Sequence, residues 1–151
     1  MIVEIVTTGT ELLLGQVVNT NSAYLANQLN KLGFDVLYHS TIGDNKKRMK
    51  ETLLLALARA DIVITTGGMG PTQGDITKEI TAEVLNRDLH LHKPSLANIE
   101  RYFAKVKCTM VESNIRQAMI PDSAVVLENY CGTAPGVVLE DNGKMIINLP
   151  G

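Results

Sequence analysis

The chain has 151 residues, of which 45% are hydrophobic and 20% charged, so it can form one packed core and is not a disordered or fibrous protein. Its formal net charge of −2 excludes the broad positive field that drives binding to nucleic acid or to membrane surfaces. It contains no recognisable targeting peptide or long apolar run, and its two cysteines indicate neither a disulfide nor a zinc site. We therefore expect a single cytoplasmic domain over residues 1–151, with no nucleic-acid or membrane partner.

The first predicted elements are a strand and a helix. A β-branched run at residues 2–7 is typical of a core strand, although Glu4 interrupts it. Leucines then recur at three- and four-residue spacing up to Leu32, which predicts a helix capped by Asn21 or Ser22. Gly33 is expected to end that helix.

Strands and helices continue to alternate along the next part of the chain. A second strand is expected over residues 34–42 and a second helix over residues 49–60. The nearly continuous apolar run at 61–66 predicts a central parallel strand covered on both faces. A glycine-rich turn leads into a further helix that is expected over residues 75–86. This order predicts an α/β fold with three layers, a doubly wound and mostly parallel sheet, and helices on both faces.

The pattern changes in the last third, where two helices and three short strands are expected. Pro94 is placed for the first turn of a helix. The turn Asp141-Asn142-Gly143 is a strong hairpin signal. The expected elements are helices over 94–105 and 114–119 and strands over 124–127, 137–139 and 145–149.

The turn Gly67-Gly68-Met69-Gly70 is the first candidate for a binding site. It follows a predicted central strand and precedes a helix, which is where open α/β sheets bind their ligands. Glycines let backbone N–H groups approach a phosphate closely, and a helix N-terminus adds favourable partial positive charge. A purely structural turn that needs positive φ accounts for the glycines equally well.

Acidic residues near the same turn are candidates for holding a divalent cation such as Mg²⁺. Asp75 and Thr77 stand at the start of the helix after the turn, and Asp44 follows the second strand. If the strands are parallel neighbours, Asp44 and Asp75 emerge on one rim, and Glu11 joins them after the first strand. Taken alone, each aspartate is more typical of a helix N-cap than of a metal ligand.

A late loop at Gly132-Thr133-Ala134-Pro135-Gly136 connects two of the short strands. Its glycines and proline fit either a tight turn or a loop that leans over a ligand. Taken alone, the composition favours the turn.

Ordered blocks along the whole chain carry a resemblance to a known family. They are residues 9–15 (Gly-Thr-Glu-Leu-Leu-Leu-Gly), Asn19-Thr20-Asn21, Gly43-Asp44-Asn45, residues 65–72 (Thr-Thr-Gly-Gly-Met-Gly-Pro-Thr), residues 75–79 (Asp-Ile-Thr-Lys-Glu), residues 114–121, residues 132–136 and Leu149-Pro150-Gly151. Together they resemble the N-terminal domain of the CinA (competence/damage-inducible) family, which is similar to the molybdopterin-binding domain of molybdenum-cofactor biosynthesis proteins.

The resemblance implies a small-molecule partner, either a pterin or a nucleotide, and a homo-oligomer. In the molybdenum branch it implies magnesium-dependent adenylyl transfer, and in the CinA branch metal-dependent hydrolysis of the ADP-ribose pyrophosphate. We expect Asp44 and Asp75 to be catalytic and to hold the divalent cation. The expected ligand-binding residues are Gly9, Glu11, Gly67, Gly68, Met69, Gly70, Pro71, Thr72, Thr77, Gly132 and Thr133.

The chain departs from the family pattern in two places. CinA-type turns usually carry a pair of aspartates where this chain has Gly74-Asp75, which implies a weaker metal site. In the CinA branch a separate C-terminal domain carries nicotinamide-nucleotide amidase activity. This chain stops at Gly151, where the family continues, so a domain truncated at its C-terminal end and without that amidase domain is expected. These departures leave a non-catalytic binding module for a pterin or nucleotide as the alternative to a hydrolase.

Overall fold

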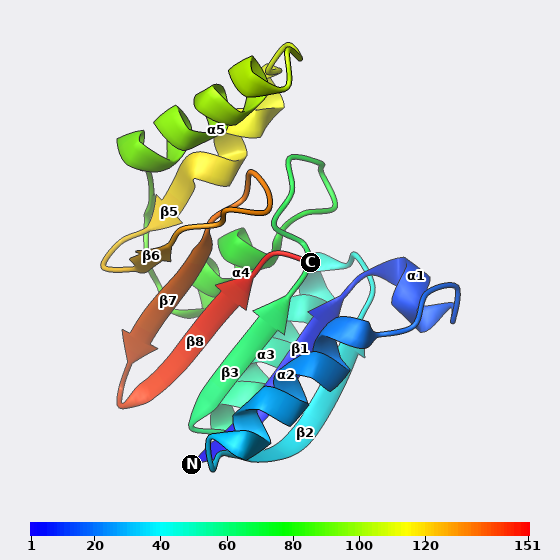
Figure 1. Ribbon diagram of the computed structural model, residues 1–151. Coiled ribbons are helices and arrows are strands. Elements are labelled where there is room, and N and C mark those ends of the chain that lie inside the picture. The colour runs from blue at the N-terminus through cyan, green and yellow to red at the C-terminus, as the bar shows by residue number, and fades with distance from the viewer.

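A computed structural model describes all residues, 1–151, and has a six-stranded sheet with helices on both faces (Figure 1). No helix is both long enough and apolar enough to cross a membrane. The strands are β1 (Ile2–Thr8), β2 (Asp35–Ile42), β3 (Ile62–Thr66), β4 (Leu89–Leu91), β5 (Met119–Pro121), β6 (Val125–Leu127), β7 (Gly136–Asp141) and β8 (Lys144–Leu149). The helices are α1 (Thr10–Leu13), α2 (Thr20–Lys31), α3 (Lys46–Arg59), α4 (Thr77–Val84), α5 (Lys93–Lys105) and the 3-10 helix η1 (Glu112–Ala118).

The main sheet confirms the expected doubly wound, mostly parallel arrangement. Its strand order is β2-β1-β3-β8-β7-β6, and β2, β1, β3 and β8 are mutually parallel. β7 and β6 add an antiparallel edge, and the predicted hairpin joins β7 to β8. Asn142 and Gly143 have φ angles of 50° and 75° there, as a two-residue turn with both central residues left-handed requires.

Side chains alternate between the two faces of the parallel strands, and each face is covered by helix. On one face, Ile62 and Ile64 of β3 pack with Leu25 and Leu29 of α2. On the other, Val63 packs in the larger cluster that includes residues of α3 and α4. Figure 1 shows α2 in front of the sheet and α3 and α4 behind it. All residues of β3 are buried, as predicted for a central strand.

Glu4 is fully buried in β1, and ion pairing explains how the strand accommodates it. Arg59 of α3 donates to both carboxylate oxygens, each at 2.8 Å, and Ser40 of β2 donates a third hydrogen bond at 2.7 Å. The Arg59 guanidinium also lies 4.1 Å above the centroid of the Tyr38 ring. A buried carboxylate is tolerated only with such partners, so Glu4 ties α3 to the sheet.

The helix caps differ from the sequence expectation. Asn19, and neither Asn21 nor Ser22, caps α2 by accepting a hydrogen bond from the Ser22 N–H. Gly33 has a φ of 82° just beyond α2, as predicted for a glycine that ends a helix.

The capping interpretation of both rim aspartates is wrong. Asn45 is the residue that caps α3, through a hydrogen bond from the Arg48 N–H. α4 begins at Thr77 after Ile76 and has no side-chain cap. Asp44 and Asp75 each lie one residue earlier than a cap would, so both carboxylates remain in the loops at the edge of the sheet.

A smaller unit built from β4, β5, α5 and η1 stands beside the main sheet (Figure 1). Lys78 of α4 holds it in place, because its ammonium donates to the carbonyl oxygens of Arg116 at 3.1 Å and Gln117 at 2.9 Å. Burial disfavours the charged ammonium and lowers the pKa of Lys78 to about 8; Glu79 opposes the shift and Arg116 adds to it.

Candidate functional site

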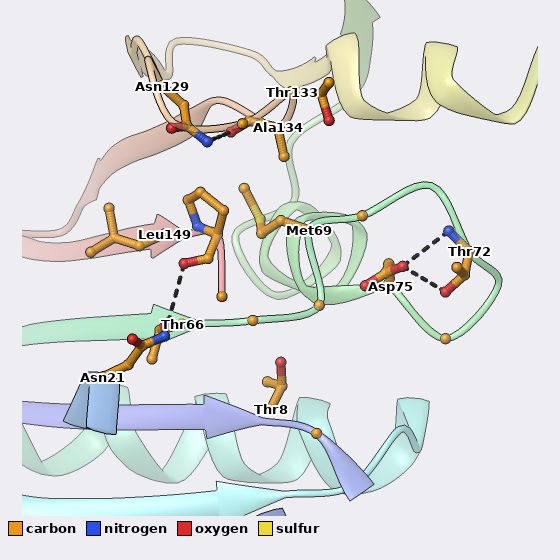
Figure 2. Close-up of a pocket in the computed structure, with 18 of the residues that line it drawn as sticks. Thr8, Asn21, Thr66, Met69, Thr72, Asp75, Asn129, Thr133, Ala134 and Leu149 are labelled. Atoms are coloured by element: carbon orange, nitrogen blue, oxygen red, sulfur yellow. Dashed lines mark hydrogen bonds between the residues drawn. The ribbon is translucent and has the colours of Figure 1, made fainter. Parts of the chain in front are cut away.

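The carboxyl ends of the parallel strands meet at one edge of the sheet, where a cleft of about 760 Å³ opens. The segments after β1, β2, β3 and β8 all contribute to it. Figure 2 shows Thr66 and Met69 at this edge, with Asn129 and Thr133 across the cleft and Asp75 on the loop beyond. The cleft therefore lies where open α/β sheets bind ligands.

The turn after β3 needs glycine at its first two positions. Gly67 and Gly68 have φ angles of 99° and 65°. A Cβ on Gly67 would lie 2.5 Å from the carbonyl oxygen of Thr8, and one on Gly68 would overlap with Oγ1 of Thr77. Thr77 is buried and fixes the turn, because its hydroxyl donates to the Gly67 carbonyl at 2.9 Å and its N–H to the Gly68 carbonyl at 3.1 Å.

Of the four backbone N–H groups of the turn, one donates a hydrogen bond within the chain and three do not. The N–H of Gly67 donates to the carbonyl of Leu149 at 3.1 Å, which holds the end of β8 against the turn. The N–H groups of Gly68, Met69 and Gly70 have no acceptor within the chain. Successive donors at the mouth of a cleft form a cradle for an anion. The expected cradle therefore begins at Gly68 and not at Gly67.

Asp75 lies on the cleft and is held by its own loop. Its Oδ2 accepts hydrogen bonds from the N–H and the hydroxyl of Thr72, at 3.0 and 2.5 Å (Figure 2). The same oxygen stands beside Gly70, since a Cβ there would lie 2.6 Å from it. A loop of residues 70–75 thus fixes the carboxylate next to Gly70, the last of the three donors, and Oδ1 has no hydrogen-bond partner.

Arg116 of η1 anchors this loop from behind. Its Nη1 donates to the carbonyl of Thr72 at 2.7 Å, and its Nη2 donates to the carbonyl of Asp75 at 3.1 Å. Nη2 also pairs with the Glu79 carboxylate at 2.9 Å. One guanidinium therefore fixes both ends of the turn that orients Asp75.

Asp44 reaches the same cleft from the loop after β2. Its Oδ2 accepts a hydrogen bond from the Thr10 hydroxyl at 3.0 Å. A Cβ on Gly74 would lie 3.6 Å from Cγ of Asp44, so the two loops are in contact. The structure therefore brings Asp44 close to the residue that precedes Asp75.

Glu11 is the third carboxylate of the cleft, and it folds back over Gly9 at the start of α1. No three side chains among His, Cys, Asp and Glu come together as potential metal ligands, so the carboxylates do not form a protein-only metal cage. Mg²⁺ is commonly held by one or two carboxylates together with substrate phosphates and water. Asp44 and Asp75 fit that second kind of site.

All the charged side chains that line the cleft are acidic. Its lining includes the carboxylates of Glu11, Asp44 and Asp75 and no Lys, Arg or His. The chain itself therefore presents only neutral hydrogen-bond donors, among them the backbone N–H groups of the turn, to an anionic ligand. A phosphate bound beside three carboxylates needs a cation from solution to offset their repulsion.

The loop between β6 and β7 forms the far wall of the cleft. Asn129 stabilises it, because its Nδ2 donates to the Ala134 carbonyl at 2.9 Å (Figure 2). Its Oδ1 accepts from the Cys131 N–H at 2.9 Å. Gly132 and Thr133, both expected from the sequence, line the cleft with Asn129. The loop leans over the cleft and is more than a tight connection.

The structure brings most of the expected site residues together. Gly9, Glu11, Asp44, Gly67, Gly68, Met69, Gly70, Thr72, Asp75, Gly132 and Thr133 all line the cleft. Pro71 does not line it, and Thr77 supports the turn from the interior.

Sequence reasoning missed several polar residues of the lining, among them Thr8, Asn21, Thr66 and Asn129. The hydroxyl of Thr8 is buried against the glycine turn without a hydrogen-bond partner, while Asn21 donates to Thr66 at 3.1 Å. Asn129 offered a signal, because Asn before a glycine-containing segment is typical of a side chain that closes a turn. Asn21 and Thr66 lie in blocks that carry the family resemblance, which was their one signal, and Thr8 offered none.

Comparisons with known proteins agree with this architecture. Residues 4–151 match the family described as "Probable molybdopterin binding domain". The chain is 51% identical over 148 residues to a putative competence-damage inducible protein of Acetivibrio thermocellus and 50% identical to a CinA-like protein of Dictyoglomus thermophilum. Each match covers 98% of this chain and 36% of the relative, so the chain spans about a third of the length of these proteins.

Solved structures extend the similarity to three dimensions. A CinA protein of Thermoplasma acidophilum superposes with a TM-score of 0.91 at 33% identity, covering 99% of this chain and 88% of that one. The molybdopterin biosynthesis enzyme MoaB of Thermus thermophilus shares the fold, with a TM-score of 0.64 at 24% identity and coverage of 99% and 80%. With a family match over nearly its whole length and relatives at about 50% identity, the chain belongs to the CinA-like, competence-damage inducible proteins and forms their molybdopterin-binding-like domain.

Proposed function

We propose that the cleft binds the phosphates of a nucleotide or pterin together with a divalent cation such as Mg²⁺. The observation that supports this most directly is the pairing of three unused N–H donors, at Gly68, Met69 and Gly70, with carboxylates in a cleft that lacks any cationic side chain. The donors suit phosphate oxygens. The carboxylates of Asp44 and Asp75 suit a cation shared with those oxygens.

We further propose that the bound ligand is an ADP-ribose-type nucleotide and that its pyrophosphate is hydrolysed. One water adds across the P–O–P linkage, the bridging P–O bond breaks, and the products are AMP and ribose 5-phosphate. A divalent cation, when bound, supplies the charge neutralisation that the acidic cleft lacks. The turn at Gly68 would hold the phosphate oxygens, and Asp44, one of whose oxygens is already fixed by Thr10, would orient the attacking water.

A non-catalytic binding module for a pterin or nucleotide is the second candidate. Two observations favour it: Gly74 supplies no carboxylate next to Asp44, and the acidic side chains of the cleft do not form a three-ligand cluster. The match to a probable molybdopterin binding domain supports the pterin as its ligand.

Binding and turnover are measured separately to test both candidates. Thermal shift and calorimetry with ADP-ribose, ATP, NAD and molybdopterin, each with Mg²⁺ or with EDTA, report ligands that stabilise the folded chain. Release of AMP from ADP-ribose reports hydrolysis. We expect metal-dependent binding and release of AMP. Metal-dependent binding without AMP supports the binding module, and metal-independent binding or no binding contradicts the proposed site.

A further inference from the structure

A second cavity, of about 280 Å³, lies on the other side of the 128–135 loop from the cleft. Its walls are α5 and the segment from Val126 to Pro135. Asn129, Gly132 and Thr133 line both this cavity and the main cleft, so the two are neighbours with a common wall. Gly132 contributes no side chain to that wall.

The second cavity carries the positive charge that the main cleft lacks. Arg101 and Lys105 line it, and their spacing of four residues places them on one face of α5. Neither forms an ion pair in the chain. The only hydrogen bond from the Arg101 side chain goes to the neutral amide oxygen of Asn98, at 3.1 Å.

The other lining groups leave those two cations available. Glu128 is the one carboxylate of the cavity, and it accepts a hydrogen bond from the Tyr130 hydroxyl at 2.5 Å. Ser95 also lines the cavity and is buried, and its hydroxyl is hydrogen-bonded to His92 at 2.8 Å. The cavity therefore has a net positive lining, with a planar guanidinium that suits two oxygens of one phosphate.

We propose that this second cavity binds a phosphate monoester on the same ligand whose pyrophosphate lies at the Gly68–Gly70 donors. The inference rests on the proposed function, and it specifies the ligand as a nucleotide with an additional phosphate group separate from the pyrophosphate. The charge distribution supports it, because the main cleft is lined by carboxylates and no cationic side chain, while the cavity that shares the wall of Asn129, Gly132 and Thr133 with it is lined by Arg101 and Lys105. Arg101 and Lys105 are then the residues that select the ligand with the additional phosphate.

Three related nucleotides test the assignment. ADP-ribose has no additional phosphate. ADP-ribose 2′-phosphate carries it at the adenosine end, and ADP-ribose 1″-phosphate carries it on the terminal ribose. Calorimetry with Mg²⁺ at constant ionic strength gives their dissociation constants. We expect one of the two phosphorylated compounds to bind about tenfold tighter than ADP-ribose, which is typical of a charge-assisted contact at a partly exposed site.

The gain from the additional phosphate is then measured in variants. Arg101→Gln with Lys105→Gln is expected to reduce it to about twofold or less, since both substituted side chains are neutral. Lys93→Gln is the matched control: it removes a charge from the same helix at a position outside the cavity and should retain the full gain. Unchanged melting temperatures confirm that the variants fold, as expected for exposed helix positions.

The outcomes separate this inference from the proposed function. If ADP-ribose binds but neither phosphorylated compound binds tighter, or if the gain persists in the double variant, the second cavity is not a phosphate site. If ADP-ribose does not bind while a phosphorylated compound binds through Arg101 and Lys105, the second cavity is a phosphate site, but the proposed function and the sharing of one ligand between the two sites both fail.

Discussion

Asp75 has one oxygen that its own loop uses and one that remains free for a ligand. Thr72 donates twice to Oδ2. Asn at this position keeps an oxygen that accepts from the Thr72 N–H, so we expect Asp75→Asn to cost less than about 1 kcal/mol of unfolding free energy. The lost negative charge should nevertheless reduce metal-dependent ligand binding about tenfold or more. Thermal melts and calorimetry with Mg²⁺ measure the two effects. Full metal-dependent binding in this variant would contradict the assignment.

Asp44 is proposed to hold the same cation, so its substitution should not act independently. We expect Asp44→Asn alone to weaken metal-dependent binding as strongly as Asp75→Asn does. The double variant should lose less than the sum of the two single losses, because the first substitution already removes most of the cation's effect. A calorimetric double-mutant cycle measures this coupling. Strictly additive losses would show that the two carboxylates act at separate places.

Gly74 offers the reverse experiment, in which a carboxylate is added. Its φ is not in the left-handed region, and a Cβ there would be in ordinary contact with Asp44 at 3.6 Å. Gly74→Asp should therefore fold and place a further carboxylate beside the proposed cation. We expect Mg²⁺ to bind several-fold tighter in the presence of ligand. Calorimetry against Gly74→Asn, which adds similar bulk without charge, isolates the contribution of the carboxylate.

At the residue scale, the sequence predicted which carboxylates reach the edge of the sheet better than it predicted which side chains cap the helices. Asp44 and Asp75 were identifiable as rim residues because they follow β2 and β3, which are both parallel to β1 between them and end at the same edge of the sheet. Their capping alternative failed because one residue of difference in where a helix begins changes which side chain caps it. That the Gly67 N–H is taken by Leu149 depends on two residues far apart in sequence, which no local pattern reports.

At the scale of the elements, η1 fixes a loop of the cleft although η1 itself lies outside the cleft. Arg116 donates to two carbonyls of the 70–75 loop and pairs with Glu79. We expect Arg116→Gln to lower the unfolding free energy by about 1–2 kcal/mol and to weaken metal-dependent ligand binding about tenfold, because the loop loses both anchors. Arg116→Lys should recover part of the binding, since it keeps the charge beside Glu79 but not the two-pronged geometry.

Arg87 is a control for Arg116, because substituting it should lower the stability of the fold without displacing the 70–75 loop. Arg87 pairs with Asp141 at 3.2 Å, and its side chain is 30% exposed, against 35% for Arg116. Arg87 does not line the cleft. We expect Arg87→Gln to cost similar stability, as measured by denaturant unfolding, and to leave ligand binding unchanged. Equal loss of binding in both variants would show that Arg116 acts only through overall stability.

The order of elements followed from the sequence because hydrophobic period and glycine placement agree in the first half of the chain. β3 and its flanking helices matched expectation, with helix ends differing by a few residues. The smaller unit was less predictable: β4 and β5 have three residues each, and η1 is a 3-10 helix whose packing depends on Lys78. Short elements carry too few residues for a periodic signal, and long-range contacts decide them.

At the scale of the whole molecule, the expected homo-oligomer remains a prediction. Large apolar side chains are exposed on the segment after β1, including Leu14 at 65% and Val18 at 81%. Exposed apolar surface of this kind is typical of an interaction site. Light scattering across a range of protein concentrations is expected to give a mass above the 16.4 kDa of one chain. Replacing Leu14 and Val18 by Ser should shift the mass toward the single chain if this segment forms the contact.

Lys78 links the whole fold to pH, because it joins α4 to the smaller unit from a buried position. Burial lowers its pKa in the folded chain to about 8, below the ordinary value of 10.5. The unfolded chain therefore binds more protons at this residue between pH 8 and 10.5, and the Lys78 contribution to stability rises with pH across that window. Below pH 8 the ammonium is charged in both states, and the full cost of its desolvation lowers the unfolding free energy.

Comparison with Lys78→Met isolates this contribution, since Met has a similar length and no charge and all other titrating groups are shared. From pH 7 to pH 11, we expect the unfolding free energy of the wild-type chain to rise relative to the variant by up to about 3 kcal/mol. Urea unfolding of both proteins at intervals of half a pH unit measures the difference. A difference that stays flat over this range would show that Lys78 keeps an ordinary pKa in the folded chain, and one that falls would show that its bonds to η1 raise the pKa; either result contradicts the lowered value.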